Sequence, residues 1–360
     1  MQVREYGSEY HWDANIPFLS ATMPQLELEQ ACYYRSGRDA LKAVAAAYRH
    51  RCDCVLLPAL CCESMVMPFA LHGIQTVFYR TNEDYTADFR DVQSKITDYC
   101  ILLYQSYFGI PSFTGQQLQM LHREHPGILL LEDRTQDLLC FKKPEERFAH
   151  ITVASVRKWT AVADGGLLWS TLPWTEPTEF EPEFATLREE ALRQKSAYHE
   201  TGDPALKDAF RKKLAKANDI LETSEVAAAM SPQTVHMLKR LDFEKMYALR
   251  RENVRVLATV LKNALDEQLL DVVTWEPDST LYFPILTQWQ SEVQTALARQ
   301  GIYCPVIWPV PEEALGICPV AEDTAHRILG VPCDHRYTPE DMRYIGKSII
   351  RTVQLCARRS

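Results

Sequence analysis

Four features of the sequence place residues that could do chemistry where a strand ends or a helix begins. Ser36 and Gly37 open an expected helix, Asp133 ends one apolar run, and Ser155 ends another, with Lys158 one helical turn later. A hydroxyl and backbone N–H groups at the positive end of a helix dipole suit a phosphate. A carboxylate can keep a ring nitrogen protonated, and a lysine amine can condense with an aldehyde. Taken singly, each residue is more often a cap, a turn residue or a solvated side chain.

Taken together, these groups are what pyridoxal phosphate needs: a lysine for its aldehyde, a carboxylate for its pyridine nitrogen and donors for its phosphate. Arg157 adds a positive charge that would keep the Lys158 amine partly neutral and nucleophilic, or it points to solvent. In open parallel sheets, ligands bind at the carboxyl ends of the strands. The residues therefore predict a cofactor site at that edge of a sheet.

The elements that must position these residues alternate between β-rich and helix-like runs from Cys54 to Ser170. The expected strands are near-continuous apolar runs, typical of a sheet that is covered on both faces. They are CVLLP from Cys54, TVFYR from Thr76, YCILLYQS from Tyr99, GILLLED from Gly127, ITVAS from Ile151 and GLLWS from Gly166. The helical runs between them are ESMVMPFALH, DFRDVQSKI and TGQQLQMLHRE. This alternation predicts an α/β domain with a mainly parallel sheet.

The remainder of the chain predicts helices and a smaller domain. Residues 175–225 are rich in charge and are broken at Gly202-Asp203-Pro204, which predicts a charged helical insertion on the surface. One long helix is expected over 232–263, and Thr338 and Pro339 mark the start of a C-terminal helix. We expect a large cofactor-binding domain over 1–240, insertion included, and a small C-terminal α/β domain over 241–360.

Composition excludes several classes of function. The chain has 360 residues, 46% of them hydrophobic, and a net charge of −9, which argues against a nucleic-acid surface. We see no apolar run of membrane-spanning length and no secretory signal at the N-terminus, so we expect a cytoplasmic protein that binds neither membrane nor nucleic acid. The eleven cysteines lack zinc-site spacing and are interpreted as small residues in a reducing compartment, without a metal.

Three motifs resemble those of a known family. LEDRTQDLL is similar to the I-E-D-x-x-Q/H signature of the DegT/DnrJ/EryC1/StrS family of pyridoxal-phosphate sugar aminotransferases. SGRDAL resembles that family's phosphate-binding helix start, and SVRKWTAVADGGLL resembles its lysine segment. The similarity extends over most of the chain, apart from the charged segment at 175–225.

The resemblance implies an α/β transferase of fold type I, built as a homodimer with its sites at the subunit interface. Lys158 would carry the cofactor as an internal aldimine, and Asp133 would pair with the pyridine nitrogen. The cofactor-binding residues would be Ser36, Gly37, Arg38 through its backbone, Cys62 at the ring face, Asp133, Gln136 near the ring hydroxyl, Ser155 and Lys158. The candidate substrate residues are Tyr303, Trp308, His335 and Arg336, and Trp159 is either a sugar platform or part of the core.

The activity that the resemblance implies is transfer of an amino group from an amino acid to a nucleotide-linked keto sugar or a similar small carbonyl compound. Two alternatives stay open: a pyridoxal-phosphate enzyme of other outcome, such as a dehydratase or lyase, and a non-catalytic binding protein with the same fold. The sequence departs from the family pattern at five places. Only two residues separate Ser155 from Lys158, Arg38 replaces a small hydroxyl residue, and Cys62 stands where an aromatic or similar group often covers the ring face. Ala227 replaces an asparagine that reaches the partner's phosphate, and no histidine is evident in the loop after Gly301-Ile302.

Overall fold

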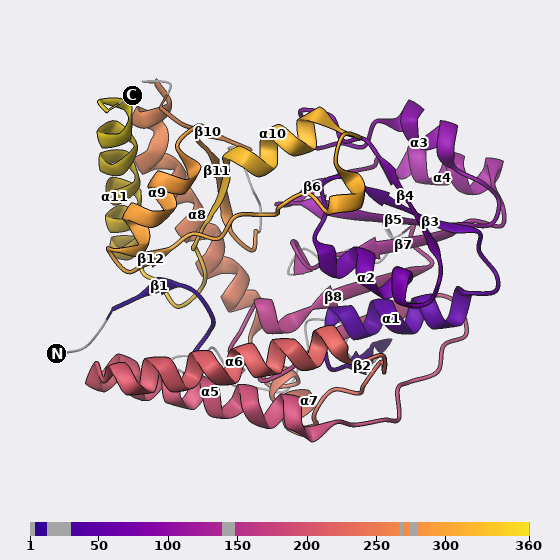
Figure 1. The fold of residues 1–360 in the computed structure, drawn as a ribbon, viewed down its shortest axis with the longest axis horizontal. Coiled ribbons are helices and arrows are strands. Elements are labelled where there is room, and N and C mark those ends of the chain that lie inside the picture. The colour runs from indigo at the N-terminus through magenta and orange to yellow at the C-terminus, as the bar shows by residue number, and fades with distance from the viewer. Residues whose placement is uncertain (1–3, 13–29, 139–147, 267–268, 274–279, 360) are drawn as a thin grey trace.

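A mixed sheet of eight strands forms the centre of the computed structural model, which describes residues 4–12, 30–138, 148–266, 269–273 and 280–359 (Figure 1). Its order is β2-β9-β8-β7-β5-β3-β4, with β6 paired to β5. The strands are β2 (Cys32–Tyr34), β3 (Cys54–Pro58), β4 (Gln75–Tyr79), β5 (Cys100–Tyr107), β6 (Ile110–Pro111), β7 (Leu129–Asp133), β8 (Ile151–Ser155) and β9 (Gly166–Ser170). Strands β4, β3, β5, β7 and β8 run parallel, whereas β9 is antiparallel to β8 and β2. The predicted mainly parallel sheet is confirmed.

Apolar residues cover both faces of this sheet, which explains the uninterrupted runs in the sequence. Leu57 faces a core shared with α1 (Gly37–Tyr48) and α2 (Glu63–Leu71). Its neighbour Leu56 faces a second core under α3 (Phe89–Lys95) and α4 (Gly115–Glu124). Because successive side chains of a strand point to opposite faces, a strand buried on both sides reads as apolar throughout.

A smaller antiparallel sheet lies to one side of the central sheet (Figure 1). It contains β10 (Asp271–Val272), β11 (Phe283–Leu286) and β13 (Ile328–Val331). Its core is shared with α8 (Phe243–Asp266), α9 (Gln290–Ala298) and α11 (Pro339–Ala357). Thr338 caps α11 in a capping box, with Pro339 in the first turn, as predicted. The domain boundary at residue 240 stays a prediction.

The single long helix predicted over 232–263 is wrong. The chain forms α7 (Pro232–Leu238) and then α8, which begins at Phe243. The side chain of Asp242 accepts a hydrogen bond of 2.8 Å from the Lys245 N–H, so it caps a new helix. Leu241 is fully buried at the break, and its burial holds the turn in place.

The charged segment forms an antiparallel pair of helices, α5 (Pro182–Thr201) and α6 (Pro204–Thr223) (Figure 1). The predicted break is confirmed, because Gly202 ends α5 with φ of 73° and Asp203 caps α6. The segment is not wholly exposed: Arg188 and Lys195 are each only 1% exposed.

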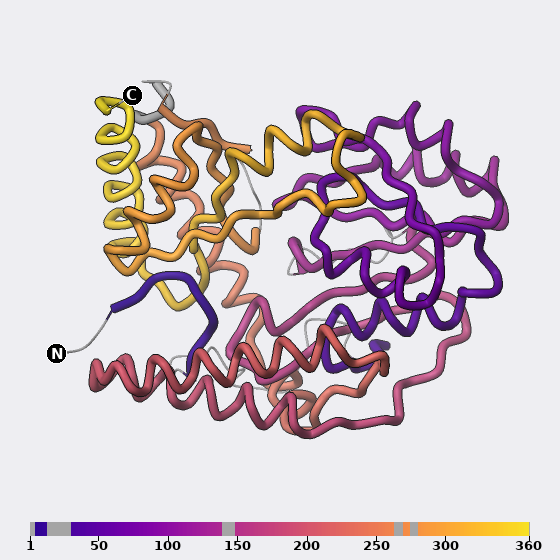
Figure 2. Tube along the Cα trace, in the orientation of Figure 1, coloured from indigo at the N-terminus to yellow at the C-terminus, as the bar shows by residue number. Residues whose placement is uncertain are grey.

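The N-terminal segment joins distant parts of the chain. Strand β1 (Tyr6–Gly7) pairs in parallel with β12 (Ile302–Tyr303), and Figure 2 follows this segment from the C-terminal helices to the α5–α6 pair. Within the described residues, no helix combines the length and the apolar character needed to cross a membrane.

Candidate active site

Two neighbouring strand ends bring the predicted chemistry together. In the parallel pair of β7 and β8, Asp133 lies opposite Val153, so Asp133 and Ser155 end at the same edge of the sheet. A 3-10 turn, η4 (Val156–Lys158), follows Ser155 directly and carries the lysine. The Ser155 N–H donates to Thr135 Oγ1 at 3.1 Å, which ties the two strand ends to each other.

The carboxylate of Asp133 is buried, with 9% of its surface exposed. It accepts a hydrogen bond of 2.8 Å from the Thr135 N–H. Burial raises the pKa of Asp133 above its usual value, and the hydrogen bonds from Thr135 and the positive charge of Lys158 oppose this rise. A buried carboxylate favours a positive partner, so a second cation beside Asp133, in addition to Lys158, would be stabilised.

The start of α1 packs closely against the ends of β8 and β9. A Cβ added at Gly37 would lie 3.3 Å from Ser155 Cβ, and one at Gly166 would lie 2.1 Å from the Ser36 carbonyl carbon. The Ser36 hydroxyl is already engaged, since it donates to Asp39 Oδ2 at 2.6 Å and accepts from the Asp39 N–H at 3.1 Å. Ser36 thus serves as the helix cap, while Gly37 allows the close approach to Ser155.

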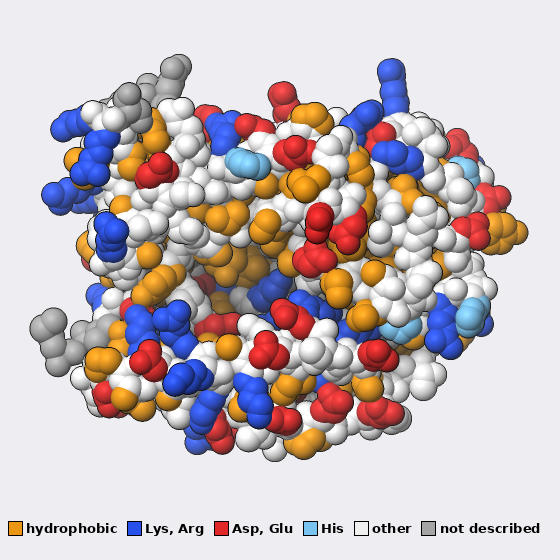
Figure 3. Space-filling model, in the orientation of Figure 1, with side chains coloured by type: hydrophobic (Ala, Val, Ile, Leu, Met, Phe, Trp, Pro, Cys, Tyr) orange, Lys and Arg blue, Asp and Glu red, His pale blue; other side chains and the backbone are white. Residues whose placement is uncertain are grey.

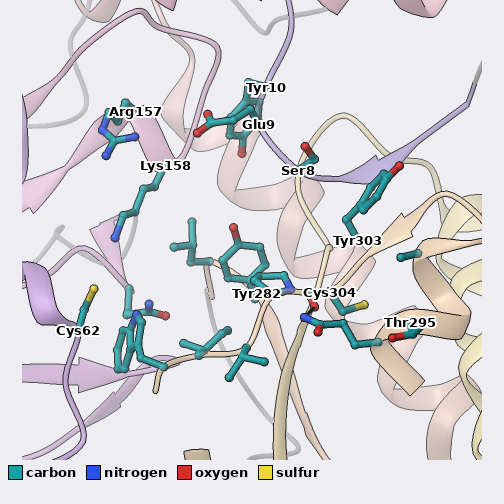
Figure 4. Close-up of a pocket in the computed structure, with 18 of the residues that line it drawn as sticks. Ser8, Glu9, Tyr10, Cys62, Arg157, Lys158, Tyr282, Thr295, Tyr303 and Cys304 are labelled. Atoms are coloured by element: carbon teal, nitrogen blue, oxygen red, sulfur yellow. Dashed lines mark hydrogen bonds between the residues drawn. The ribbon is translucent and has the colours of Figure 1, made fainter. Parts of the chain in front are cut away.

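A cavity of about 970 Å³ opens beside these strand ends. The space-filling view shows the hollow near its centre, with Lys and Arg side chains inside it (Figure 3). Lys158 extends into the cavity from one wall, on the side where Cys62 lies, and Tyr282, Tyr303 and Cys304 lie across from it (Figure 4). The N-terminal residues Ser8, Glu9 and Tyr10 complete the lining.

Five of the predicted site residues line this cavity: Cys62, Gln136, Lys158, Tyr303 and Trp308. Ser36, Gly37, Asp133 and Ser155 lie at the strand and helix ends just described, and Arg38 follows Gly37 in the first turn of α1. Gln136 Oε1 is buried and has no hydrogen-bond partner among the described residues.

His335 and Arg336 lie outside the cavity lining. The Arg336 guanidinium binds Asp334 through two hydrogen bonds of 2.8 Å, and it stacks on the ring of Tyr10 at 4.1 Å. His335 also stacks on Tyr10, with 5.9 Å between the two ring centroids. Both residues thus support the N-terminal segment in this structure, and their predicted contact with substrate remains a prediction.

Trp159 belongs to the core, which decides between its two interpretations. Its side chain is fully buried, its Nε1–H donates to the Thr135 carbonyl at 2.8 Å, and the Arg250 guanidinium lies 4.5 Å from its ring. Trp159 therefore holds the η4 turn against the end of β7, and its ring is not available to a sugar.

Sequence reasoning missed Thr135 and the N-terminal residues of the site. Thr135 lies inside the motif LEDRTQDLL, and its position between two expected strand ends was an available signal. No local signal marks Glu9, Tyr10 or Tyr282, because each reaches the cavity through contacts with residues that are far away in the sequence.

A lysine and a carboxylate lie at adjacent ends of a mostly parallel sheet, with a glycine-started helix packed against them, and this α/β fold matches that of fold type I aminotransferases. The model of the DegT/DnrJ/EryC1/StrS aminotransferase family matches residues 26–350, so this chain belongs to that family and is an aminotransferase. The predicted family, fold and enzyme class are confirmed. No protein of curated function matches the chain in sequence.

Solved structures of low sequence identity share this fold. The putative sugar aminotransferase Spr1654 of Streptococcus pneumoniae, in its PMP form, is 12% identical with a TM-score of 0.68, covering 100% of both chains. PseC of Helicobacter pylori, an aminotransferase involved in the biosynthesis of pseudoaminic acid, is 15% identical with a TM-score of 0.64, covering 98% of this chain and 100% of its own. DesI, solved in the presence of its TDP-sugar product, is 15% identical with a TM-score of 0.61, covering 95% and 89%.

Proposed function

We propose that this aminotransferase transfers an amino group from an amino acid to the carbonyl group of a nucleotide-linked keto sugar or a similar small carbonyl compound. The observation that carries the proposal is the strand-end pair of Lys158 and Asp133, with Lys158 lining the cavity. Family membership and the sugar-linked activities of PseC and DesI support the acceptor class.

Pyridoxal phosphate is the cofactor, and the residues present fit it. Asp133 offers a buried carboxylate of raised pKa for the pyridine nitrogen, and Gln136 offers an unpartnered amide oxygen. Gly37 and Ser155 border the start of α1, where backbone N–H groups would hold the phosphate. When bound, the cofactor supplies an aldehyde and an electron sink for carbanion chemistry.

Lys158 has two tasks in this arrangement. Its amine would hold the cofactor covalently at rest. Once released, the amine would act as general base and acid, taking the proton from the amino-bearing carbon of the donor and delivering it to the cofactor carbon that carried the aldehyde. The η4 turn fixes the backbone of Lys158 against Trp159, while the side chain remains half-buried and extends into the cavity. The backbone of Lys158 is therefore fixed, while its side chain has room to move a short distance within the cavity.

The cavity is large enough for an extended acceptor. Its volume of about 970 Å³ lies at the upper end of small-molecule sites, which span roughly 300–1,000 Å³. Tyr303 lines the side away from the strand ends, where its ring can stack on a sugar or a base (Figure 4). Trp308 instead lines the cavity near the end of β5, with its ring centroid 6.4 Å from that of Tyr107. We infer that the acceptor's carbonyl group points to Lys158 and its far end to Tyr303.

We further propose that the enzyme is a cytoplasmic homodimer, as the family resemblance predicts. Light scattering should then give twice the chain mass of 41.3 kDa. A monomeric mass at the concentrations of the enzyme assay would contradict the dimer.

The decisive experiment follows the visible absorbance of the purified protein, with and without added pyridoxal phosphate. Wild type should show a cofactor band, and borohydride treatment should attach the cofactor irreversibly to the peptide that contains Lys158. Lys158→Ala should lose both signals. Amino-acid donors are then screened by bleaching of the band, and nucleotide-linked keto sugars by its return. Absence of a band in wild type with excess cofactor would refute the proposal.

A further inference from the structure

We propose that Arg157 binds the phosphate group of the cofactor, as a second anchor beside the start of α1. The inference rests on the proposed function and adds to it a binding residue that is specific to this chain. Arg157 lies directly before Lys158 in the η4 turn and lines the same cavity (Figure 4).

Arg157 is a partly buried cation without a partner. Its Nε is buried and has no hydrogen-bond partner, and it forms no ion pair with any residue in the described part of the chain. Buried guanidinium groups are normally paired with carboxylates or carbonyls, because an unpaired charge is costly to desolvate. Such a group on a cavity wall is best explained by an anion that binds there.

The neighbouring charges leave Arg157 unsatisfied. Burial, followed by the like charge of Arg188, lowers the pKa of Arg157 to about 10, and Arg38 acts in the same direction. Glu9 is the carboxylate that opposes this effect most, yet its own oxygen accepts from Arg188 at 2.9 Å. Arg188 also donates to the Ala163 carbonyl, so its charge is satisfied while that of Arg157 is not.

The phosphate site would otherwise be short of positive charge. The Ser36 hydroxyl is used within the helix cap, and Asp39 places a carboxylate in the first turn of α1. A carboxylate in the first turn offsets the positive end of the helix dipole and so weakens its attraction for another anion. Arg35 binds Asp39 through two hydrogen bonds of 2.9 and 2.8 Å, which neutralises it but adds no charge toward the cavity. Arg157 can supply the charge that is missing.

The chemistry of the cofactor agrees with this position. Its phosphate ester is carried by the ring carbon next to the one that bears the aldehyde, whereas the ring nitrogen lies opposite the aldehyde. The phosphate must therefore lie near the lysine and away from Asp133. Ser155, two residues before Arg157, touches the start of α1 at Gly37, so η4 and the helix start border the same space.

The test compares two ligands that differ only in the phosphate. Apo wild type and Arg157→Gln are titrated with pyridoxal phosphate and with pyridoxal, and binding is followed by absorbance. Loss of a charge-assisted contact should weaken pyridoxal phosphate about 10- to 100-fold. The affinity for pyridoxal should stay within about 2-fold, because it makes no such contact. The affinity of Arg157→Lys for pyridoxal phosphate should lie between those of wild type and Arg157→Gln. Arg193→Gln, on the exposed face of α5, is the control and should bind both ligands as wild type does.

A second readout separates binding from structural support. Apo Arg157→Gln should melt at the same temperature as apo wild type or higher, since it removes an unpaired buried charge. Its stabilisation by pyridoxal phosphate should be smaller than that of wild type. A lower melting temperature of the apo variant, or equal losses for both ligands, would show a structural role and overturn the inference.

Two further outcomes are informative. Unchanged affinity for both ligands, with weakened binding of a nucleotide sugar, would assign Arg157 to the acceptor's diphosphate and overturn the inference while the proposed function stands. Failure of wild type to bind pyridoxal phosphate would instead refute the proposed function itself.

Discussion

Replacement of Gly166 by alanine should damage both stability and cofactor binding. The new Cβ would lie 2.1 Å from the Ser36 carbonyl carbon, 2.2 Å from its oxygen and 2.6 Å from the Gly37 nitrogen. Ordinary contacts begin near 3.4 Å, so the backbones must separate by about 1.3 Å. Gly166 is paired with Tyr34 on β2 and with Ser155 on β8, and neither neighbour lets β9 withdraw alone.

The magnitude follows from this constraint. Overpacking of a well-packed core costs about 1–3 kcal/mol. Because the new Cβ would meet the Ser36–Gly37 backbone and not a flexible side chain, we expect Gly166→Ala to cost about 3 kcal/mol. The start of α1 must also move away from Ser155. A displacement of about 1 Å takes a hydrogen bond out of its normal range, so the affinity for pyridoxal phosphate should fall about 10-fold or more.

The assay combines urea unfolding of the apo protein with cofactor titration. Gly73→Ala is the control, because Gly73 lies in a turn with φ of 71° and has open space around its Cβ position, so it tests backbone strain without a steric clash. The control should cost about 1 kcal/mol from backbone strain alone and leave cofactor affinity unchanged. If Gly166→Ala costs no more than the control and binds the cofactor as wild type does, the argument from close approach is wrong.

Three other substitutions test the buried charges. Burial raises the pKa of Asp133, so the stability of the apo wild type should fall as pH rises above 3.8, the usual pKa of the group. Asp133→Asn should not show this fall when urea midpoints are measured across the same pH range. Burial, with Arg336, lowers the pKa of Lys195 to about 7, so stability should rise between about pH 7 and 10.5 in wild type and stay flat in Lys195→Met. Arg250→Leu should destabilise by about 3–5 kcal/mol in urea unfolding, because it leaves the Tyr10 hydroxyl and buried carbonyls without their donor.

Local signals in the sequence predicted the sheet and the two chemical groups at its edge. Lys158 and Asp133 follow apolar runs whose ends are marked by polar residues, and Ser36 and Thr338 start helices with side chains that cap them. Such signals span a few residues and depend on local backbone hydrogen bonding, so they can be recognised without knowledge of the rest of the fold.

The residues that sequence reasoning did not place depend on distant partners. A charged stretch such as 182–223 reads as solvent-exposed, yet Arg188 and Lys195 are buried because Glu9 meets both of them. That meeting requires β1 to pair with β12, nearly 300 residues away in the chain. The break between α7 and α8 had a local signal, the Asp242 cap, which the interpretation of 232–263 as one long helix did not take into account.

These distant contacts suggest how the enzyme separates cofactor binding from acceptor binding. One wall of the cavity consists of strand and helix ends, which the parallel sheet fixes through its core. The facing N-terminal segment is held by cations instead: the Glu9 carboxylate binds Arg188, and its carbonyl accepts from Lys195 and from Arg336. Ion pairs and hydrogen bonds depend on geometry more than apolar packing does, so this wall is the easier one to reshape by substitution. Substitution of Ser8, which lines this wall beside Tyr303 and away from Arg157 (Figure 4), should therefore alter acceptor affinity and leave cofactor affinity near that of wild type, whereas changes at the strand ends should affect both.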